Sequence, residues 1–320
     1  MLLAPLRAAF GLFKEAVDAW IEDYAPSMGA ALSYYSLFSI APLLLIAVGV
    51  AGLIFGEQAA RGEIFGQLRE LMGDQGAVAV ERLLASADKP EGGIIATTTG
   101  IVVLLLGAMT VFGELQNALD RIWRAPARKK AAGWWNLLHS RLLSFGMILG
   151  IAFLLMVSLV LSALVSALGK LWGPAFKDWE TIAHLIDILV SFGMVTLLFA
   201  MIYKFIPRVR IAWRDVWVGA AVTAVLFAAG KVLIGLYLGK STVASAFGAA
   251  GSLAVMMVWV YYSAQIFLLG AEFTWIYAHA YGSRRGERRP RPEDSAPVVP
   301  RSPGGPPGAA RPDYRGVPNP

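Results

Sequence analysis

The chain contains no cysteine, only three histidines and few charged residues. Without cysteine it has no disulfides, thiolate metal ligands or cysteine nucleophiles. His139, His184 and His279 are isolated in the sequence, and no grouping of acidic or nucleophilic residues has the spacing of a metal or catalytic site. We therefore predict no metal, no cofactor and no enzyme activity. Charged residues make up 16% of the chain, against about 25% in soluble domains, so much of the surface is expected to face lipid.

The sequence contains several long runs without charged residues. Residues 29–56 hold no charged side chain, and as a helix they would extend roughly 42 Å, which exceeds the hydrocarbon core of a bilayer. Five further runs are long enough to span, two of them with one internal charge. The sequence therefore predicts an all-α membrane protein with six transmembrane helices in one bundle, at residues 29–56, 92–112, 142–168, 182–206, 216–238 and 246–271.

Basic residues are unevenly divided between the two sides of these predicted spans. The segments on the side of both termini hold 17 Lys and Arg, and the opposite segments hold seven, which predicts that both termini are cytoplasmic. The basic residues lie between apolar runs and form no single field, so no nucleic-acid partner is expected. The expected partners are the lipid bilayer and, at the basic inner loops and tail, anionic lipids.

Three segments outside the spans have their own character. Residues 1–28 carry apolar residues at helical spacing, which predicts an amphipathic helix along the inner interface. The loop at 57–91 predicts two short helices over the outer face, separated by a break at Gly73, Asp74 and Gly76. Residues 283–320 hold ten of the 17 prolines and are predicted to be a disordered cytoplasmic tail.

Tryptophan and glycine positions give packing predictions. Five tryptophans flank the inner span ends and are interpreted as interfacial anchors: Trp123, Trp134, Trp135, Trp213 and Trp217. Three glycine pairs have the spacing that allows close helix contact and predict a compact bundle: Gly52 and Gly56, Gly146 and Gly150, Gly235 and Gly239.

Polar groups at membrane depth are the functional candidates. In the first span, Ser33, Ser36 and Ser39 advance by three and form a ridge that we predict faces the sixth span. Pro42 breaks the same run and frees the Phe38 carbonyl, which then needs another donor.

The sixth span carries a stripe of residues on one helical face that includes Tyr261, Gln265 and Glu272. We predict that this stripe points into the bundle or into a water-filled cavity, because lipid contact would leave Gln265 without hydrogen-bond partners. The expected partners at the inner end are Glu114, Asn117 and Lys204. Two interpretations stay open, an interhelical hydrogen-bond staple and the lining of a conduit.

Two ionisable residues, Asp187 and Lys231, lie inside the predicted fourth and fifth spans near their outer ends. Their similar depth allows them to pair. Three interpretations stay open: Lys231 extends to the outer headgroups, the two residues form a structural pair, or they take part in transport.

Four segments carry a family resemblance: SYYSLFSIAPLLL in the first span, NALDRIW after the second, WRDVWVGA at the start of the fifth, and FGAAGSLAVMMVWVYYSAQIFLLGAEF in the sixth. In this order and spacing they resemble the YihY/BrkB family of bacterial inner-membrane proteins, over about residues 14 to 280. One departure is Asp120, where the family pattern leads us to expect asparagine. The resemblance implies a six-helix fold in the plasma membrane, but it assigns no catalytic or transport residue.

Three functions follow as hypotheses. The first is a transporter or permease-like protein for an unidentified solute or lipid, based on the buried polar groups and the proline in the first span. The alternative is a non-transporting envelope or membrane-organising protein whose polar residues are structural. The third is an RNA-cleaving enzyme, because family members have been labelled ribonuclease BN-like, and it is disfavoured by the lack of a catalytic cluster.

Overall fold

The computed structural model describes residues 3–87, 107, 110–126, 179–240 and 250–287. All regular secondary structure in these ranges is helical. Besides a helix at 110–122, the elements are α1 (Leu3–Glu22), α2 (Ala25–Phe55), α3 (Glu57–Ala87), α6 (Trp179–Phe205), α7 (Trp213–Lys240) and α9 (Gly251–Ala280). The all-α prediction is thus confirmed for the described residues.

Three described helices are long and apolar enough to cross a membrane, over Ile188–Phe205 in α6, Trp213–Leu238 in α7 and Gly251–Ala280 in α9. They coincide with the predicted fourth, fifth and sixth spans, and α2 covers the predicted first. The predicted second span lies largely, and the third wholly, outside the described residues. The six-span bundle therefore stays a prediction, as does the disordered tail, most of which also lies outside the described residues.

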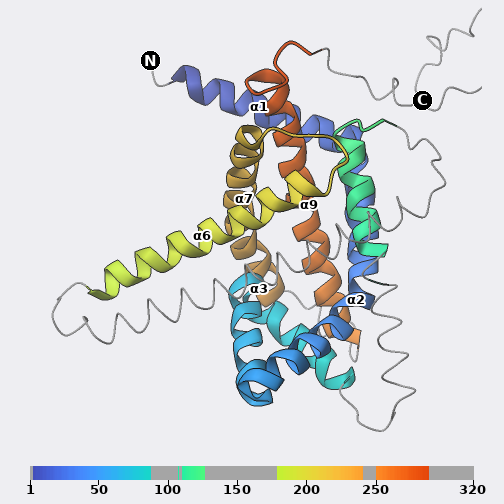
Figure 1. Cartoon of the computed structure of the whole chain (residues 1–320), viewed down its shortest axis with the longest axis vertical. Helices are drawn as coiled ribbons and strands as arrows, with labels where there is room; N and C mark the ends of the chain where they lie inside the picture. The colour runs from blue at the N-terminus through green and yellow to red at the C-terminus, as the bar shows by residue number, and fades with distance from the viewer. Residues whose placement is uncertain (1–2, 88–106, 108–109, 127–178, 241–249, 288–320) are drawn as a thin grey trace, which may run out of the picture.

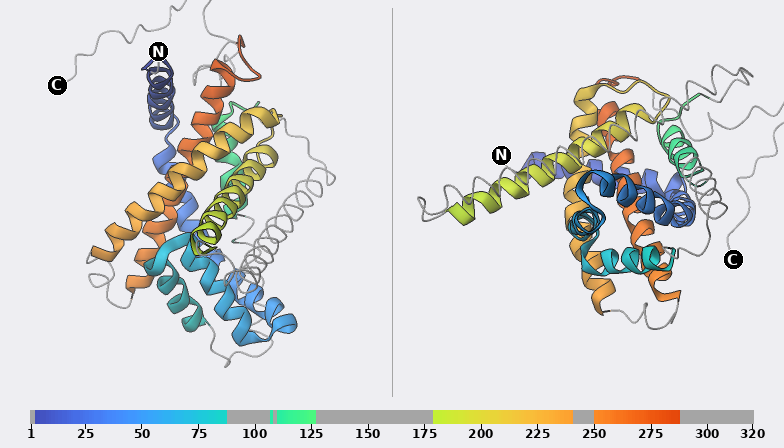
Figure 2. Two further views of the ribbon diagram at one scale, coloured as in Figure 1. Left: turned by 90° about the vertical axis from the view of Figure 1, so that its left-hand side faces the viewer. Right: turned by 60° about the horizontal axis from the view of Figure 1, so that its bottom comes forward.

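Helix α9 is the centre of the fold. It packs against α1, α2, α3 and α7 and runs through the middle of the molecule (Figure 1). Helix α6 packs against α7, and its amino-terminal end projects away from the other helices (Figures 1 and 2). Helix α1 lies beside the carboxyl end of α9. We call this end of the molecule the α1 end.

The amphipathic N-terminal helix is confirmed, although it ends at Glu22 and not at residue 28. Tyr24 has a left-handed backbone (φ 57°) that separates the two helices, and α2 begins at Ala25. The first turn of α2 contains Pro26, where a missing N–H costs nothing because the first N–H groups of a helix have no intrahelical acceptor. Helix α2 continues through Pro42 as one helix, in agreement with a single predicted span there. The ribbon bends part-way along (Figure 1), and the free Phe38 carbonyl stays a prediction.

The predicted break in the first outer loop is confirmed. Helix α3 consists of two helical pieces that meet at Gly73, whose backbone is extended with positive φ (φ 74°, ψ 171°). Glycine alone takes this conformation without strain. The second piece brings Val80 against Met256 of α9, beside Met72.

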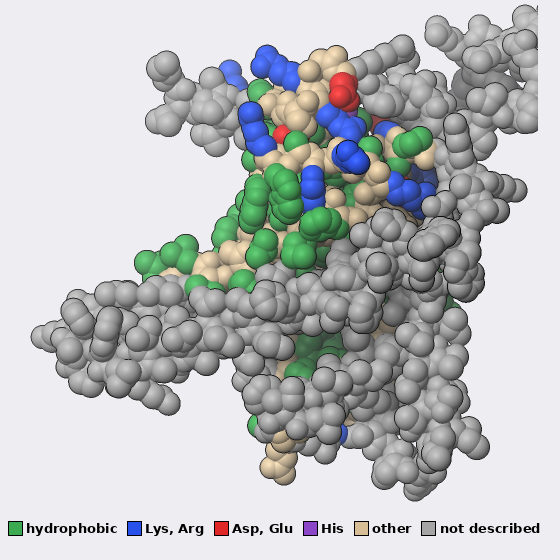
Figure 3. Space-filling model, in the orientation of Figure 1, with side chains coloured by type: hydrophobic (Ala, Val, Ile, Leu, Met, Phe, Trp, Pro, Cys, Tyr) green, Lys and Arg blue, Asp and Glu red, His purple; other side chains and the backbone are tan. Residues whose placement is uncertain are grey.

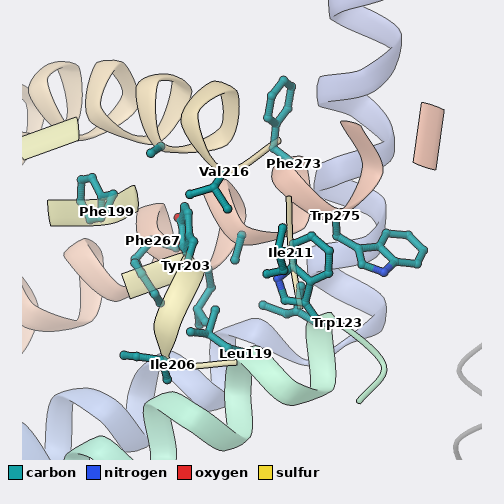
Figure 4. Close-up of a cluster of buried hydrophobic side chains, with 14 of the residues drawn as sticks. Leu119, Trp123, Phe199, Tyr203, Ile206, Ile211, Val216, Phe267, Phe273 and Trp275 are labelled. Carbon is teal, nitrogen blue, oxygen red and sulfur yellow. The ribbon is translucent and has the colours of Figure 1, made fainter. Parts of the chain in front are cut away.

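The largest buried cluster lies towards the α1 end and joins α6, α7, α9 and the helix at 110–122. Figure 4 shows Tyr203 beside Phe267 and Trp123 close to Ile211 within it. The prediction that Trp123 is an interfacial anchor is wrong, because the chain after residue 122 turns this indole into the core, where it is 1% exposed. Trp213 and Trp217 are exposed, as anchors require, and Trp134 and Trp135 lie outside the described residues.

Helices α7 and α9 approach closely at two glycines facing two threonines. A β-carbon on Gly219 would lie 2.6 Å from Thr274 Cβ, and one on Gly270 would lie 2.8 Å from Thr223 Cβ. Gly235 has the spacing that allows close contact, but a β-carbon there meets no atom within 4 Å. Spacing permits a close approach, and the crossing point of two helices decides which glycines are in contact.

A candidate site at the α1 end of the bundle

The candidate site consists of two buried carboxylates, Glu272 of α9 and Asp23 between α1 and α2, and of Arg124 after the helix at 110–122, whose side chain is 7% exposed. We call them the carboxylate cluster. Glu272 is 0% exposed and Asp23 is 1% exposed. Arg124 forms an ion pair with Asp23, and its guanidinium carbon lies 5.6 Å from the ring centre of Trp275, one turn beyond Glu272 in α9.

Strained backbone positions two of the elements that carry these charges. Tyr24 and Arg124 are the two non-glycine residues with positive φ in the described part of the chain (φ 57° and 49°). At Arg124 the Ala125 N–H donates to the Asp120 carbonyl at 2.8 Å, which closes the helix in the way that normally requires glycine. An L-residue in this conformation costs about 1–2 kcal/mol. The chain thus accepts strain at the position whose side chain reaches Asp23.

Glu272 has no hydrogen-bond donor for either carboxylate oxygen among the described residues, and Asp23 Oδ2 has none either. The electrostatic neighbours of Glu272 are the acidic Asp23 and Glu22 and the basic Arg124. The Asp23 carboxylate is the group placed to share a hydrogen bond with Glu272. Two ionised carboxylates have no proton to share, so this contact becomes a bond only when one of them is protonated.

The first half of α2 lies against α9, as predicted for the serine ridge. Ser33 Oγ donates to the Met257 carbonyl at 2.8 Å, which confirms the prediction for Ser33. Ser39 instead donates to the Ser36 carbonyl at 3.1 Å, and a β-carbon on Gly107 would lie 3.2 Å from Ser39 Cβ. The ridge therefore faces two different neighbours along its length, because a row of i, i+3 positions winds around the helix.

Gln265 reaches the start of α2. Its Nε2 donates to the Pro26 carbonyl at 3.4 Å, and its side chain fills the space above Gly29. Gln265 Oε1 is buried without a partner among the described residues. Together with Glu272, this side chain points into the bundle as predicted, whereas Tyr261 on the same stripe is exposed. Tyr261 lines a shallow, apolar groove between α7 and α9, so the prediction fails for this residue.

The prediction that Lys204 contacts the polar stripe of α9 is wrong. The Lys204 amine donates to the carbonyl of Ile211, in the loop between α6 and α7, and lies 5.3 Å from the ring centre of Trp213, the first residue of α7. Arg124 occupies the place predicted for Lys204 beside Glu272. In the helix at 110–122, Asn117 is exposed and Glu114 is half-buried, and neither is among the electrostatic neighbours of Glu272.

The predicted pairing of Asp187 with Lys231 stays a prediction. Lys231 is half-buried in α7. Asp187 belongs to α6, but its side chain lies outside the described residues.

Two further carboxylates bind the loops at the α1 end. Asp215, in the first turn of α7, accepts hydrogen bonds from the backbone N–H of Ser283 at 3.1 Å and from its hydroxyl at 2.5 Å. Asp120 accepts the Arg208 backbone N–H at 2.9 Å and pairs with the Arg208 guanidinium at 3.1 Å. Burial raises the pKa of Asp120, and the N–H and guanidinium of Arg208 oppose this rise.

Sequence reasoning missed Asp23 and Arg124. Arg124 falls among the basic residues of a predicted inner loop, and Asp23 falls in the predicted N-terminal helix segment at 1–28. The available signals were weak: Asp23 stands just before the Ala25-Pro26 helix start, and Arg124 directly follows the NALDRIW segment. Neither signal indicates that the two side chains meet.

Exposed basic residues surround the site. Figure 3 shows Lys and Arg side chains gathered at the α1 end, with hydrophobic side chains beyond them along α6. Arg208, Arg210, Arg214 and Arg285 are exposed there. This distribution agrees with the charge asymmetry of the sequence.

Comparison with known proteins identifies the family. The virulence factor BrkB family matches residues 16–295. A UPF0761 membrane protein of Pseudomonas paraeruginosa is 30% identical over 88% of this chain and 64% of its own length. Similar proteins of Azotobacter vinelandii and Tolumonas auensis are 28% and 27% identical, over 67% and 80% of their lengths. This chain thus spans less than two thirds of the Pseudomonas relative, and no solved structure matches it. The protein is an integral membrane protein and belongs to the virulence factor BrkB family.

Proposed function

We propose that the protein is a permease-like transporter of the bacterial plasma membrane, with both termini in the cytoplasm and the carboxylate cluster near the cytoplasmic face. The observation that carries the proposal is Glu272, a fully buried carboxylate in an apolar helix with no hydrogen-bond donor among the described residues. Ionisable groups at such positions are costly and are retained where ions or solutes pass. Its substrate is an unidentified solute or lipid.

The neighbouring polar groups support the same proposal. Gln265 lies two turns from Glu272 on the same side of α9 and has a buried, unpartnered oxygen. Both residues face the start of α2, where the backbone is strained at Tyr24. Unsatisfied polar groups next to a strained turn are a pattern found at sites that change conformation.

The test is flux through purified protein in vesicles. Proteoliposomes are loaded with an isotope-labelled bacterial metabolite extract, and the outside medium is followed by mass spectrometry, with labelled lipids assayed for transfer between leaflets. Wild-type flux is expected to fall at least tenfold in Glu272→Gln and in Gln265→Leu. Asp74→Asn is the matched control, because its carboxylate pairs with Arg69 at the surface. Absence of flux for every class, with a wild-type phenotype in cells carrying both variants, would exclude transport.

The orientation has its own test. A reporter that is active only outside the cytoplasm, fused after Ala85, is expected to be active, and a fusion after Arg285 is expected to be inactive. A cytoplasmic signal at Ala85 would reverse the proposed topology.

The second candidate is a non-transporting envelope protein with structural polar contacts. It is favoured by the α7–α9 interface, where the buried Thr223 and Thr274 hydroxyls donate to backbone carbonyls of their own helices. Such bonds stabilise a bundle without providing a pathway. This candidate predicts that Glu272→Gln changes stability and leaves every flux and phenotype unchanged.

A further inference from the structure

We infer that Glu272 and Asp23 form a binding site for a single proton, held between their two carboxyl groups. The balance of charges in the carboxylate cluster leads to this inference. Arg124 forms an ion pair with Asp23, and the half-exposed Arg121 lies 3.9 Å from the same Asp23 oxygen. Both guanidinium groups are thus placed at Asp23 and neither donates to Glu272, which leaves the Glu272 carboxylate without a bonded cation in a fully buried position. Burying an unpaired carboxylate costs far more than burying a neutral carboxyl group, so the site needs one positive charge.

The contact between the two acids identifies that charge as a proton. A proton on either carboxyl lets it donate to the other, which satisfies Glu272 and Asp23 Oδ2 together. A metal cation would need several oxygen ligands, and in the part of the chain that the structure describes no three acidic or histidine side chains are placed to hold a metal ion together. The adjacent Arg124 guanidinium also repels a cation. The proton comes from water and binds one carboxylate oxygen, and no other bond changes.

Other titratable groups near the site must be separated from this effect. Those on α1, on the segment after the helix at 110–122 and on α9 are Glu22, Asp23, Arg121, Arg124 and His279, while the half of α2 that faces the site carries no charge. Arginine stays charged throughout the accessible pH range. Histidine is the side chain whose ordinary pKa lies closest to neutral pH, and His279 Nδ1 lies 2.8 Å from the Trp275 carbonyl. It therefore needs its own control variant.

Loss of the proton changes which carboxylate can form the ion pair with Arg124. With both acids ionised, Glu272 competes with Asp23 for the guanidinium of Arg124, and the two carboxylates repel each other. Asp23 is joined to the strained Tyr24, so release of its ion pair frees the turn between α1 and α2 to move away from α9. The proton site is independent of transport, but its use as the coupling ion rests on the proposed function.

Infrared spectroscopy of the reconstituted protein tests the proton directly. Wild type is expected to show the carbonyl band of a protonated, buried carboxyl group at neutral pH, and Glu272→Gln is expected to lose it. Asp23→Asn is expected to lose it too, because the amide can donate to Glu272 in place of the proton. The band should persist in the controls Glu22→Gln, which removes an exposed neighbouring acid, and His279→Gln.

Three results would overturn the inference: no such band in wild type, a band that survives in Glu272→Gln, or a band that sodium abolishes at constant pH, which would assign the site to a metal cation. A pH series on wild type alone covers the case in which a variant does not fold. A native state that holds the extra proton must lose stability as the pH rises, and an unfolding midpoint that is flat or rises with pH would contradict it. Flux without the infrared band would contradict only the proton site, whereas the band without flux would contradict only the proposed transport.

Discussion

Glycine-to-alanine substitutions along α7 test how tightly this helix packs on α9. At Gly219 the new β-carbon would lie 2.6 Å from Thr274 Cβ, closer than β-carbons approach other atoms in proteins. Thr274 cannot turn away freely, because it is fully buried and its hydroxyl donates to the Gly270 carbonyl at 2.6 Å. The helices must separate, and overpacking of this kind costs about 1–3 kcal/mol of unfolding free energy.

Two other glycines of the same helix provide graded controls. At Gly230 the new β-carbon meets mainly the terminal Cδ1 of Ile266, which can move, and at Gly235 it meets no atom within 4 Å. All three substitutions gain the same helix propensity, about 1 kcal/mol, so differences between them report packing alone. The expected order of stability is Gly235→Ala above Gly230→Ala above Gly219→Ala.

The assay is unfolding by sodium dodecyl sulfate in mixed micelles, followed by circular dichroism. Gly235→Ala is expected to unfold at or slightly above the wild-type detergent fraction, and Gly219→Ala well below it. Equal midpoints for the Gly219 and Gly235 variants would refute the close α7–α9 contact, and with it the positions of Thr223 and Thr274 in the interface.

Three further substitutions test the contacts at the α1 end and the core beside it. The raised pKa of Asp120 means that the native state holds a proton to higher pH than the unfolded chain, so the contribution of Asp120 to stability falls as the pH rises from 3.8 through the raised pKa. Asp120→Asn should therefore flatten this slope when thermal unfolding is measured across pH. At pH 7 the same substitution should change stability by less than about 1 kcal/mol, because an amide oxygen still accepts the Arg208 N–H. Asp215→Ala removes the acceptor of both Ser283 bonds and should cost about 1–2 kcal/mol in thermal unfolding, with faster proteolysis after α9. Tyr203→Phe removes a buried hydroxyl that bonds two neighbours and should cost about 0.5–1.5 kcal/mol in the same detergent titration, whereas an unchanged midpoint would contradict those bonds.

Element positions were largely predictable from the sequence, because uncharged length and helical periodicity are properties of the chain itself. Helix α7 begins three residues before the predicted span at Val216, since Trp213 and Arg214 belong to its first turn. Helix α9 continues past Ala271 to Ala280, because Glu272 ends an uncharged run without ending a helix. Hydropathy marks what lipid tolerates, and hydrogen bonding decides where a helix stops.

The candidate site was predictable only in part. Glu272 and Gln265 stood out because a polar residue in an apolar helix is conspicuous on its own. Their partners were not predictable, because Lys204 at the end of α6 and Asp23 and Arg124 in turns are all charged residues next to predicted span ends, and the choice between them depends on how the chain turns. In those turns Tyr24 and Arg124 have a left-handed backbone conformation, and neither residue type gives a sequence signal for it.

The two sides of α9 differ in a way that brings the two functional candidates together. On the α7 side, buried hydroxyls are bonded to carbonyls and glycines fix the helix distance, so this interface is expected to be rigid. On the side of α1 and α2, buried charged atoms lack partners and the connecting backbone is strained. A conformational change needs an interface with two arrangements of similar energy, and among the described residues the second side holds the buried charged groups that another arrangement would satisfy better. If the protein moves during its function, α1 and the start of α2 should move against a fixed α7–α9 pair.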